Sequence, residues 1–444
     1  MEAWLPEQWT GRFLSTGNGG LDGCIQYVDV AYATALGFAT VGANNGHNGT
    51  SGEPFYNNPD VVTDFAWRSI HTNVVIGKEI VQQFYGQAQH KSYYLGCSTG
   101  GREGIKSAQM FPNDFDGIVA GAPAVAFNNL SAWSGHFLLL TGTPDSSTFV
   151  SFEQWNTIVA SDIMAQCDGI DGVLDGIIED PLLCDYRPES LICSGSTSNA
   201  STCLTPEQAL TVRLIFQPLY GNGGHLVYPR MQPGSELNGA PEIYYNGEPF
   251  PYTSDWYRYA VYNNPNWNAA TIGPNDYDAA YTIDPGDIES WDGNLAPYRD
   301  AGGKLLHYHG QADPIISSDN SPRYYDHVSR TMGQKSSELD SFYRFFRISG
   351  MSHCAGGAGA WMIGQTSAGN ATLDPSGNVL TAMVRWVEEG TAPDTIEGVK
   401  YENDTESLGV SFIRRHCRWP YRSTYIGGDS RNPNSWTCKP GAGA

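Results

Sequence analysis

No stretch of this 444-residue chain approaches the roughly 20 consecutive apolar residues that a membrane-spanning helix needs. Positive charge is also scarce, because 25 Lys and Arg residues stand against 47 Asp and Glu residues and give a formal net charge of −22. Proteins that bind nucleic acid neutralise its phosphates with positive charge, so this balance has the wrong sign. We therefore expect neither a membrane nor nucleic acid among its partners.

The chain lacks Cys-x-x-Cys and His-Glu-x-x-His, which are common signatures of redox and zinc sites. Its nine cysteines are therefore better explained as structural disulfides of a secreted protein. Nine is odd, and the chain opens at Met1-Glu2-Ala3-Trp4 with no signal-peptide pattern. We hypothesise that an upstream segment holds the export signal and a partner for Cys24; the alternative is that Cys24 is a buried free thiol. Five glycosylation sequons fit secretion but add little weight: Asn48, Asn129, Asn199, Asn370 and Asn403.

Strand-like and helix-like segments alternate at both ends of the chain, which is typical of a parallel sheet covered by helices. We predict an α/β fold on this basis. The expected strands are residues 12–14, 39–41, 92–95, 117–120, 304–307 and 342–348. The expected helices are residues 78–85, 104–110 and 382–388.

Residues 128–292 differ from both ends, being rich in Asp, Gly, Asn, Tyr, Trp and Pro without a sustained periodicity. We interpret them as an irregular inserted lid domain over the carboxyl ends of the strands, where open α/β sheets bind ligands. Residues 1–127 and 293–444 then form the catalytic domain.

A Gly-x-Ser-x-Gly motif, Gly96-Cys97-Ser98-Thr99-Gly100, lies between an expected strand and an expected helix. A nucleophile elbow needs small residues two positions before and after the serine, because the sharp turn brings those positions against neighbouring backbone. The turn lifts the serine hydroxyl into the cleft and directs the amide of Thr99 at a developing oxyanion. Ser98 is therefore the candidate nucleophile.

A catalytic serine needs a base and an orienting carboxylate, which follow it in that fold in the order acid and then histidine. Asp313 follows the strand near residue 304, and His353 follows the strand that ends near Ile348. We predict that they are the acid and the base. His307 and His309 are the competing histidines, and we expect them to have structural roles near the Asp313 loop.

Cysteines adjoin two of these candidates, with Cys97 directly before Ser98 and Cys354 directly after His353. If Ser98 and His353 lie within hydrogen-bond reach, their neighbours are close enough for the roughly 5.5 Å Cα separation of a disulfide. We therefore predict a bridge between Cys97 and Cys354 that fixes nucleophile and base relative to each other.

The Cys-Ser, Asp and His-Cys elements at Ser98, Asp313 and His353 resemble those of the tannase and feruloyl esterase family, and the similarity extends from about Trp9 to Cys438. The resemblance implies a secreted serine esterase with an α/β-hydrolase fold and a large lid. It also implies esters of phenolic acids as substrates, either small aromatic esters or feruloylated polysaccharide. Ferulate, gallate and terephthalate monoesters are all substrates within the family, and overall resemblance favours a feruloyl esterase over a tannase.

Two further sites follow. The glycine-rich turn after the first expected strand predicts the second oxyanion amide, which we place at Gly19; a plain tight turn is the alternative.

In the insertion, acidic residues recur among glycines, and the family resemblance assigns a structural calcium there. We place it on the side chains of Asp168, Asp171 and Asp175 and the carbonyls of Val173 and Ile177, with a solvated acidic turn as the alternative.

The remaining cysteines are expected to pair locally. Cys167 with Cys184 and Cys193 with Cys203 would hold the insertion, and Cys417 with Cys438 would hold the C-terminal tail.

Other classes remain open from the sequence. A peptidase or an acyltransferase could use the same triad. A penicillin-binding type of hydrolase is disfavoured because the chain has no Ser-x-x-Lys. A non-catalytic, calcium-dependent carbohydrate-binding protein would explain the acidic loop, but not the ordered Ser98, Asp313 and His353. The aromatic-rich residues 256–267 suit an aromatic ring or the core of the lid itself.

Overall fold

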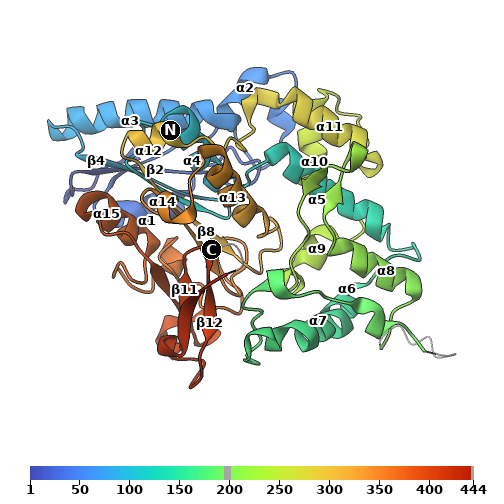
Figure 1. Ribbon diagram of the computed structural model, residues 1–444. Coiled ribbons are helices and arrows are strands. Elements are labelled where there is room, and N and C mark those ends of the chain that lie inside the picture. The colour runs from blue at the N-terminus through green and yellow to red at the C-terminus, as the bar shows by residue number, and fades with distance from the viewer. Residues whose placement is uncertain (195–201, 442–444) are drawn as a thin grey trace.

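The computed structural model describes residues 1–194 and 202–441. Its centre is a seven-stranded sheet in the order β1-β3-β2-β4-β5-β8-β9 (Figure 1), parallel throughout except for β1, which pairs antiparallel with β3. The strands are β1 (Glu2–Trp4), β2 (Arg12–Thr16), β3 (Ala39–Gly42), β4 (Lys91–Cys97), β5 (Gly117–Gly121), β8 (Lys304–Gly310) and β9 (Tyr343–Ile348). This is the α/β-hydrolase fold that the sequence predicts, and the six predicted strands are all present.

Helices cover both faces of the sheet because successive residues of each strand point to opposite sides. On β2, Phe13 packs into the apolar cluster on one face and Leu14 into the cluster on the other. The first face carries α3 (Ser69–Tyr85), α4 (Thr99–Met110), α12 (Ala296–Asp300), α13 (Asn320–Met332) and α14 (Ser336–Leu339). The second carries α1 (Tyr27–Ala35) and α15 (Val379–Glu389). The three helices expected from the sequence are parts of α3, α4 and α15.

The segment 128–292 lies beside the sheet (Figure 1) and is substantially helical, so its prediction as an irregular domain is wrong. Its elements are α5 (Phe127–Thr141), α6 (Phe152–Gln154), α7 (Ala160–Cys167), α8 (Pro206–Ile215), β6 (Leu219–Tyr220), β7 (Leu226–Tyr228), α9 (Ala240–Tyr244), α10 (Pro251–Asp255) and α11 (Pro274–Ile283). The longest helix, α5, is buried on most sides and therefore lacks the one-sided apolar pattern of a surface helix.

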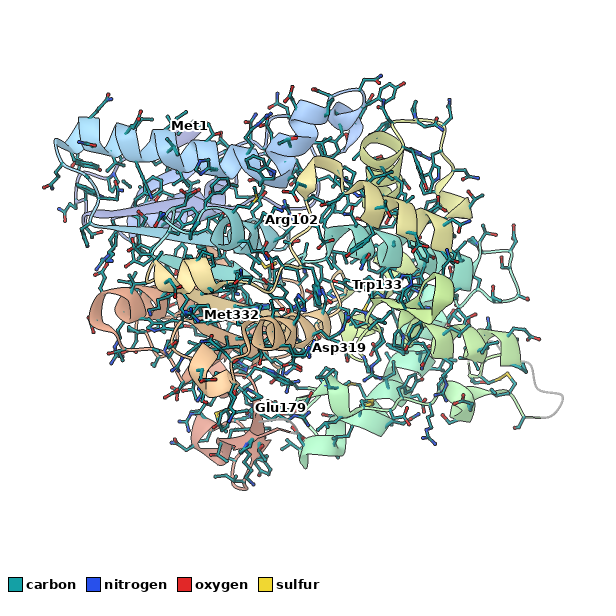
Figure 2. All side chains as sticks on the ribbon, turned by 45° about the horizontal axis from the view of Figure 1, so that its top comes forward. Met1, Arg102, Trp133, Glu179, Asp319 and Met332 are labelled. Atoms are coloured by element: carbon teal, nitrogen blue, oxygen red, sulfur yellow. A yellow bond between two sulfur atoms is a disulfide. The ribbon has the colours of Figure 1, made fainter. Side chains whose placement is uncertain are left out.

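One apolar cluster joins this segment to the sheet part of the chain. It contains Trp133 of α5, which Figure 2 labels, together with Phe65 and Ile316 from outside the segment. Short α2 (Pro59–Thr63) adds Val62 to the same cluster. The division at residues 128 and 292 stays a prediction, and the shared cluster holds the two parts together.

The C-terminal region consists of two antiparallel hairpins (Figure 1). The first pairs β10 (Thr395–Tyr401) with β11 (Val410–Cys417), and the second pairs β12 (Tyr421–Tyr425) with β13 (Trp436–Pro440). No helix in the described residues is long and apolar enough to cross a membrane.

Candidate active site

Ser98 sits on the sharp turn between β4 and α4, as predicted. Its backbone has φ +65° and ψ −123°, a conformation that a residue with a side chain rarely adopts. The flanking glycines are sterically required: a Cβ at Gly96 would lie 2.7 Å from the Gly100 carbonyl oxygen, and one at Gly100 would lie 2.9 Å from the Asn18 carbonyl oxygen. The motif therefore forms the strained elbow that presents a nucleophile.

Asp313 and His353 meet as predicted, at loops that follow the ends of β8 and β9. His353 Nδ1 lies 2.7 Å from Asp313 Oδ2, and the Asp313 side chain is fully buried. Burial would raise the pKa of Asp313, but the adjacent His353 and the hydrogen bonds from His309 and His353 outweigh it and hold that pKa well below its usual range. A carboxylate that stays ionised can orient an imidazole and stabilise its protonated form.

The predicted disulfide between Cys97 and Cys354 is present, with Cα atoms 6.1 Å apart. It fixes the residues next to Ser98 and His353 to each other across a sequence separation of 257. Ser98 Oγ makes no hydrogen bond to His353 or to any other described residue. Nucleophile–base hydrogen bonds are often long in structures without substrate, so the missing bond does not exclude this pair.

The glycine-rich loop after β2 is held against the first turn of α4. Thr99 Oγ1 donates to the Gly20 carbonyl (2.7 Å), and the Gly100 amide donates to the Asn18 carbonyl (2.8 Å). In return the Asn18 amide donates to Glu103 Oε2 (3.0 Å). These bonds place the loop beside Ser98, where a second oxyanion amide is needed.

Sequence reasoning missed Glu103. Its carboxylate is buried and also accepts from Asn45 Nδ2 (2.9 Å) and from the Tyr94 hydroxyl (3.2 Å). Burial raises the pKa of Glu103, against the opposing effect of Arg102. The only signal in the sequence was an acidic residue in the helix directly after the elbow.

A cavity of about 50 Å³ opens at Ser98. Gly20 and Leu21 line it with Ser98 and Thr99, whereas Gly19 is not among its lining residues, so Gly19 stays a prediction for the second amide. The remaining walls are mainly apolar or aromatic and include Phe127, Leu130, Tyr244, Phe250, Tyr252, Ile315 and Ile316. A mainly apolar cavity therefore adjoins the candidate nucleophile.

A larger cavity of about 310 Å³ lies on the other side of the start of α5. Asn129 lines it, whereas the next residue, Leu130, lines the cavity at Ser98. Ser98 lines the smaller cavity and not the larger one, so the smaller one is the candidate active site.

The acidic loop predicted to bind calcium is stabilised by its own hydrogen bonds. The Asp168 carboxylate accepts from the amides of Asp175 (3.4 Å) and Gly176 (3.2 Å), and Asp171 Oδ1 accepts from the Val173 amide (2.9 Å). Asp171 Oδ2 is buried without a hydrogen-bond partner among the described residues. No group of three His, Cys, Asp or Glu side chains is arranged to hold a metal ion in the described part of the chain.

A buried ionic network connects this loop to the region of His353. Arg414 of β11 donates to Asp175 Oδ2 (2.8 Å) and to Glu179 Oε2 (2.5 Å), and Ser349 donates to Glu179 Oε1 (2.6 Å). Burial raises the pKa of Glu179 to about 7, although Arg414 opposes the rise. Figure 2 shows Glu179 beside the C-terminal hairpins.

The other three predicted disulfides are also present, and Cys24 is free and exposed, so the alternative of a buried thiol is wrong. The pairs are Cys167–Cys184, Cys193–Cys203 and Cys417–Cys438. The sequon at Asn199 lies outside the described residues.

A serine on a strained strand-to-helix turn, with an Asp–His pair on loops at the ends of later strands, defines a serine hydrolase of the α/β-hydrolase fold. Comparison with known proteins narrows this class. The model of the family described as "Tannase and feruloyl esterase" matches residues 1–273 and 274–439. The chain therefore belongs to the tannase and feruloyl esterase family.

Comparison with individual proteins gives the same family. The chain is 57% identical over 439 residues to a probable feruloyl esterase B-2 of Aspergillus terreus, covering 99% of this chain and 82% of that protein. It is 54% identical to feruloyl esterase C of Talaromyces stipitatus, with coverage of 99% and 82%. The crystal structure of feruloyl esterase B from Aspergillus oryzae superposes with a TM-score of 0.96 at 54% identity, covering 98% of this chain and 87% of that one. Tannin acyl hydrolase from Aspergillus niger shares the fold, with a TM-score of 0.80 at 21% identity and coverage of 99% and 83%.

Proposed function

We propose that this protein is a secreted feruloyl esterase, a serine hydrolase that cleaves esters of hydroxycinnamic acids. The observation that carries the proposal is the pairing of His353 with Asp313 at 2.7 Å next to a disulfide that ties His353 to the Ser98 elbow. A non-catalytic carbohydrate-binding protein has no need for a strained serine beside such a pair.

In the proposed mechanism Ser98 Oγ attacks the ester carbonyl while His353 Nε2 takes its proton. Asp313 holds the imidazole through Nδ1 and stabilises the imidazolium that forms. The amide of Thr99 and an amide of the loop around Gly19 stabilise the oxyanion. His353 then gives its proton to the leaving alcohol, and water releases the acid from Ser98 by the same route.

The relatives' names and the cavity lining favour ferulate over gallate. Leucine, isoleucine and phenylalanine side chains make up much of the cavity wall, which suits a ring with one hydroxyl and one methoxyl group. The wall also carries hydroxyls, but Thr253 already donates to the Ser131 carbonyl (2.8 Å) and Tyr244 to the Ile315 carbonyl (2.7 Å). Gallate would bring three hydroxyls that compete for the few polar partners left, and burying a hydroxyl without a partner is costly.

The experiment compares kcat/KM for methyl ferulate and methyl gallate. We expect methyl ferulate to be preferred by about tenfold or more, since unpaired polar groups give discrimination of this order or greater. The variant Ser98→Ala should lose turnover of both esters, whereas Ser147→Ala, at an exposed position, should keep it. Equal or greater kcat/KM for methyl gallate would make the protein a tannase, and inertness toward both esters would contradict the proposal.

We propose secretion, the natural substrate and glycosylation on separate grounds. Four disulfides support an oxidising compartment. Feruloylated polysaccharide is the proposed natural substrate, and N-glycosylation at the sequons is part of the same proposal.

A structural Ca²⁺ is proposed at the acidic loop, held by Asp168, Asp171 and Asp175 with the carbonyls of Val173 and Ile177. Calcium prefers oxygen ligands of this kind, and the buried, unpartnered Asp171 Oδ2 supports the assignment. A bound cation would neutralise the clustered carboxylates and stabilise the loop.

A further inference from the structure

The Asp313 carboxylate is hydrogen-bonded to a second histidine besides His353. Asp313 Oδ1 accepts from the amides of Ile315 (2.8 Å) and Ile316 (2.9 Å), while Oδ2 accepts from both His353 Nδ1 (2.7 Å) and His309 Nε2 (3.1 Å). The His309 side chain is 1% exposed and lies four residues before Asp313. The described residues thus supply every hydrogen bond of a carboxylate that has no access to solvent.

A chain of buried polar groups continues behind His309. His309 Nδ1 lies 2.6 Å from Ser321 Oγ on α13, and Ser321 Oγ lies 2.8 Å from His307 Nε2 on β8. His307 Nδ1 in turn lies 3.0 Å from the Tyr343 hydroxyl on β9. All four side chains are buried, so their hydrogen bonds depend on one another rather than on water.

The donor and the acceptor of each hydrogen bond in this chain can be assigned in turn, starting from Asp313. A carboxylate can only accept, so His309 Nε2 carries a proton. If His309 is neutral, its Nδ1 is an acceptor and the Ser321 hydroxyl donates to it. Ser321 Oγ then accepts from His307.

The same reasoning fixes the far end of the chain. His307 donates from Nε2, so its Nδ1 accepts from the Tyr343 hydroxyl. Burial lowers the pKa of His307 far below its ordinary value, which agrees with a neutral ring.

A cationic His309 would still donate to Asp313 but would reverse the three bonds that run from its Nδ1 to the Tyr343 hydroxyl. It would also place a second positive charge next to the same carboxylate oxygen as His353, whose ring must become positive during the reaction. Two buried positive charges sharing one carboxylate are unfavourable, so the neutral chain is the arrangement compatible with catalysis.

We propose that His309 is a positioning residue of the triad: as a neutral imidazole it donates from Nε2 to Asp313 Oδ2, and the chain Tyr343–His307–Ser321 donates a hydrogen bond to its Nδ1. The proposal rests on the proposed function. His309 occupies one lone-pair direction of Oδ2 and leaves the other for His353 Nδ1. His353 is thereby held with Nε2 unprotonated and available to accept the proton of Ser98.

The first test reads the tautomer directly and needs no substrate. In ¹⁵N spectra of the histidine-labelled protein at pH 7, His309 should show a protonated Nε2 and an unprotonated Nδ1, with assignment by single substitution of the histidines. In Ser321→Ala, Nε2 should stay protonated because it still faces the Asp313 carboxylate, whereas the Nδ1 resonance should shift because Nδ1 loses its hydrogen-bond donor. A His309 protonated on both nitrogens in the unmodified protein, or an Nδ1 resonance unchanged in Ser321→Ala, would overturn the proposal even if the protein were an active esterase.

The second test separates positioning from folding. His309→Phe removes the donor but keeps a ring, and kcat for methyl ferulate should fall about tenfold to a hundredfold with little change in KM, as when other orienting partners are removed. His309→Gln keeps an Nε2 donor and should recover much of the loss, and His90→Phe, at an exposed histidine, should retain full kcat. Unchanged kcat in folded His309→Phe, or no advantage of Gln over Phe, would refute the role. If His309→Phe does not fold, the His309→Gln and Ser321→Ala results decide.

Discussion

At the scale of single residues, the site depends on one serine with a strained backbone and on the hydrogen bonds that stabilise that backbone. Ser98 holds φ +65°, a conformation that costs about 1–3 kcal/mol and persists only where its surroundings fix it. Its carbonyl accepts from the amides of Arg102 (3.0 Å) and Ala124 (3.1 Å), and its own amide donates to Gly121 (3.0 Å). The peptide groups of Ser98 are thus paired on both sides of the strained angle, and Oγ is left for the reaction.

Glu103 gives the first prediction. In Glu103→Gln one carboxylate oxygen becomes an NH₂ group. Facing the Asn18 amide it would oppose another donor; facing Asn45 it could bond to Oδ1 once that amide turns over, but the charged acceptor is lost in either case. We expect a loss of about 1–3 kcal/mol of unfolding free energy from the unsatisfied group or the lost charged acceptor. Because the loop that carries Asn18 also holds the amide proposed for the oxyanion site, kcat for methyl ferulate should fall by about tenfold or more, less than the loss of a whole oxyanion donor.

The measurement is kcat alongside urea unfolding at fixed pH. Glu406→Gln, at an exposed glutamate, is the matched control and should change neither quantity. A folded Glu103→Gln protein with full kcat would show that the loop does not depend on this carboxylate.

The sequence predicts residues of this site only where local pattern carries the information. Ser98 is marked by its two glycines, and His353 and Asp313 by their place after strands. Glu103 and His309 are different, because their roles come from partners that the fold alone brings near: Asn18 is 85 positions from Glu103 and Ser321 is 12 from His309. Pattern placed His309 near Asp313 but could not show that it shares the same oxygen.

At the scale of elements, three strand ends converge and a disulfide joins two of them. β4 delivers Ser98 and the loop beyond β9 delivers His353, on strands separated by β5 and β8 in the sheet. The loop beyond β9 reaches the end of β4, where the Cys97–Cys354 bridge holds the two Cα atoms 6.1 Å apart. Its value for catalysis is that nucleophile and base stay adjacent when the loops fluctuate.

Removing that bridge should therefore affect both stability and rate. The double variant Cys97→Ser/Cys354→Ser opens a separation of 257 residues, which the chain-entropy model values at up to about 5 kcal/mol. We expect a large drop in unfolding free energy and, in the fraction that stays folded, a lower kcat. Both are measured at a temperature well below the unfolding transition.

The variant Cys193→Ser/Cys203→Ser is the control, because it opens a separation of only 10 residues and lies outside the catalytic site. It should lose less stability, up to about 3 kcal/mol, and keep its kcat. Equal kcat in both double variants would show that the Cys97–Cys354 bridge does not position the triad.

α3 and α15 were predicted where apolar residues recur on one face, and the strands as short β-like runs, although helices cover both faces of the sheet. α4 was expected next to the Gly-x-Ser-x-Gly motif, although its residues 99–108 are all buried. α5 was missed because most of its residues are buried against the sheet part and the insertion alike. α8 did carry a usable signal, a capping box from Thr205 to Gln208 with Pro206 at the first helical position.

At the scale of the whole molecule, the segment 128–292 is connected to the rest through a shared apolar cluster and through buried charge. Arg414 from the C-terminal hairpin joins Asp175 and Glu179, and Arg347 of β9 makes a two-bond ion pair with Asp180 (2.8 and 2.9 Å). Buried ion pairs of this kind are costly to break from one side, by about 3–5 kcal/mol. Ion pairs of the acidic loop and the residues directly after it therefore connect the insertion to β9 and to the C-terminal hairpins.

Calcium at this loop should stabilise the whole chain. At a free concentration of about 100 times Kd a ligand adds about 2.7 kcal/mol, which raises Tm by several degrees in a protein of this size. We expect Tm to be higher in Ca²⁺ than in a chelator, and Asp171→Asn to abolish the difference. Asp145→Asn, at an exposed aspartate, should keep it. Equal Tm values in calcium and chelator, or a shift that survives Asp171→Asn, would leave the loop as a solvated acidic turn.

The most direct measurement of the central claim is to locate the acylated side chain. After rapid quenching of the enzyme during turnover of an activated ferulate ester, peptide mass spectrometry should find one feruloyl group, attached to Ser98, and none in Asp313→Asn, which orients the imidazole wrongly and acylates far more slowly. A feruloyl group on any other residue, or turnover without a covalent intermediate in a sample quenched during a kinetic burst, would contradict the account.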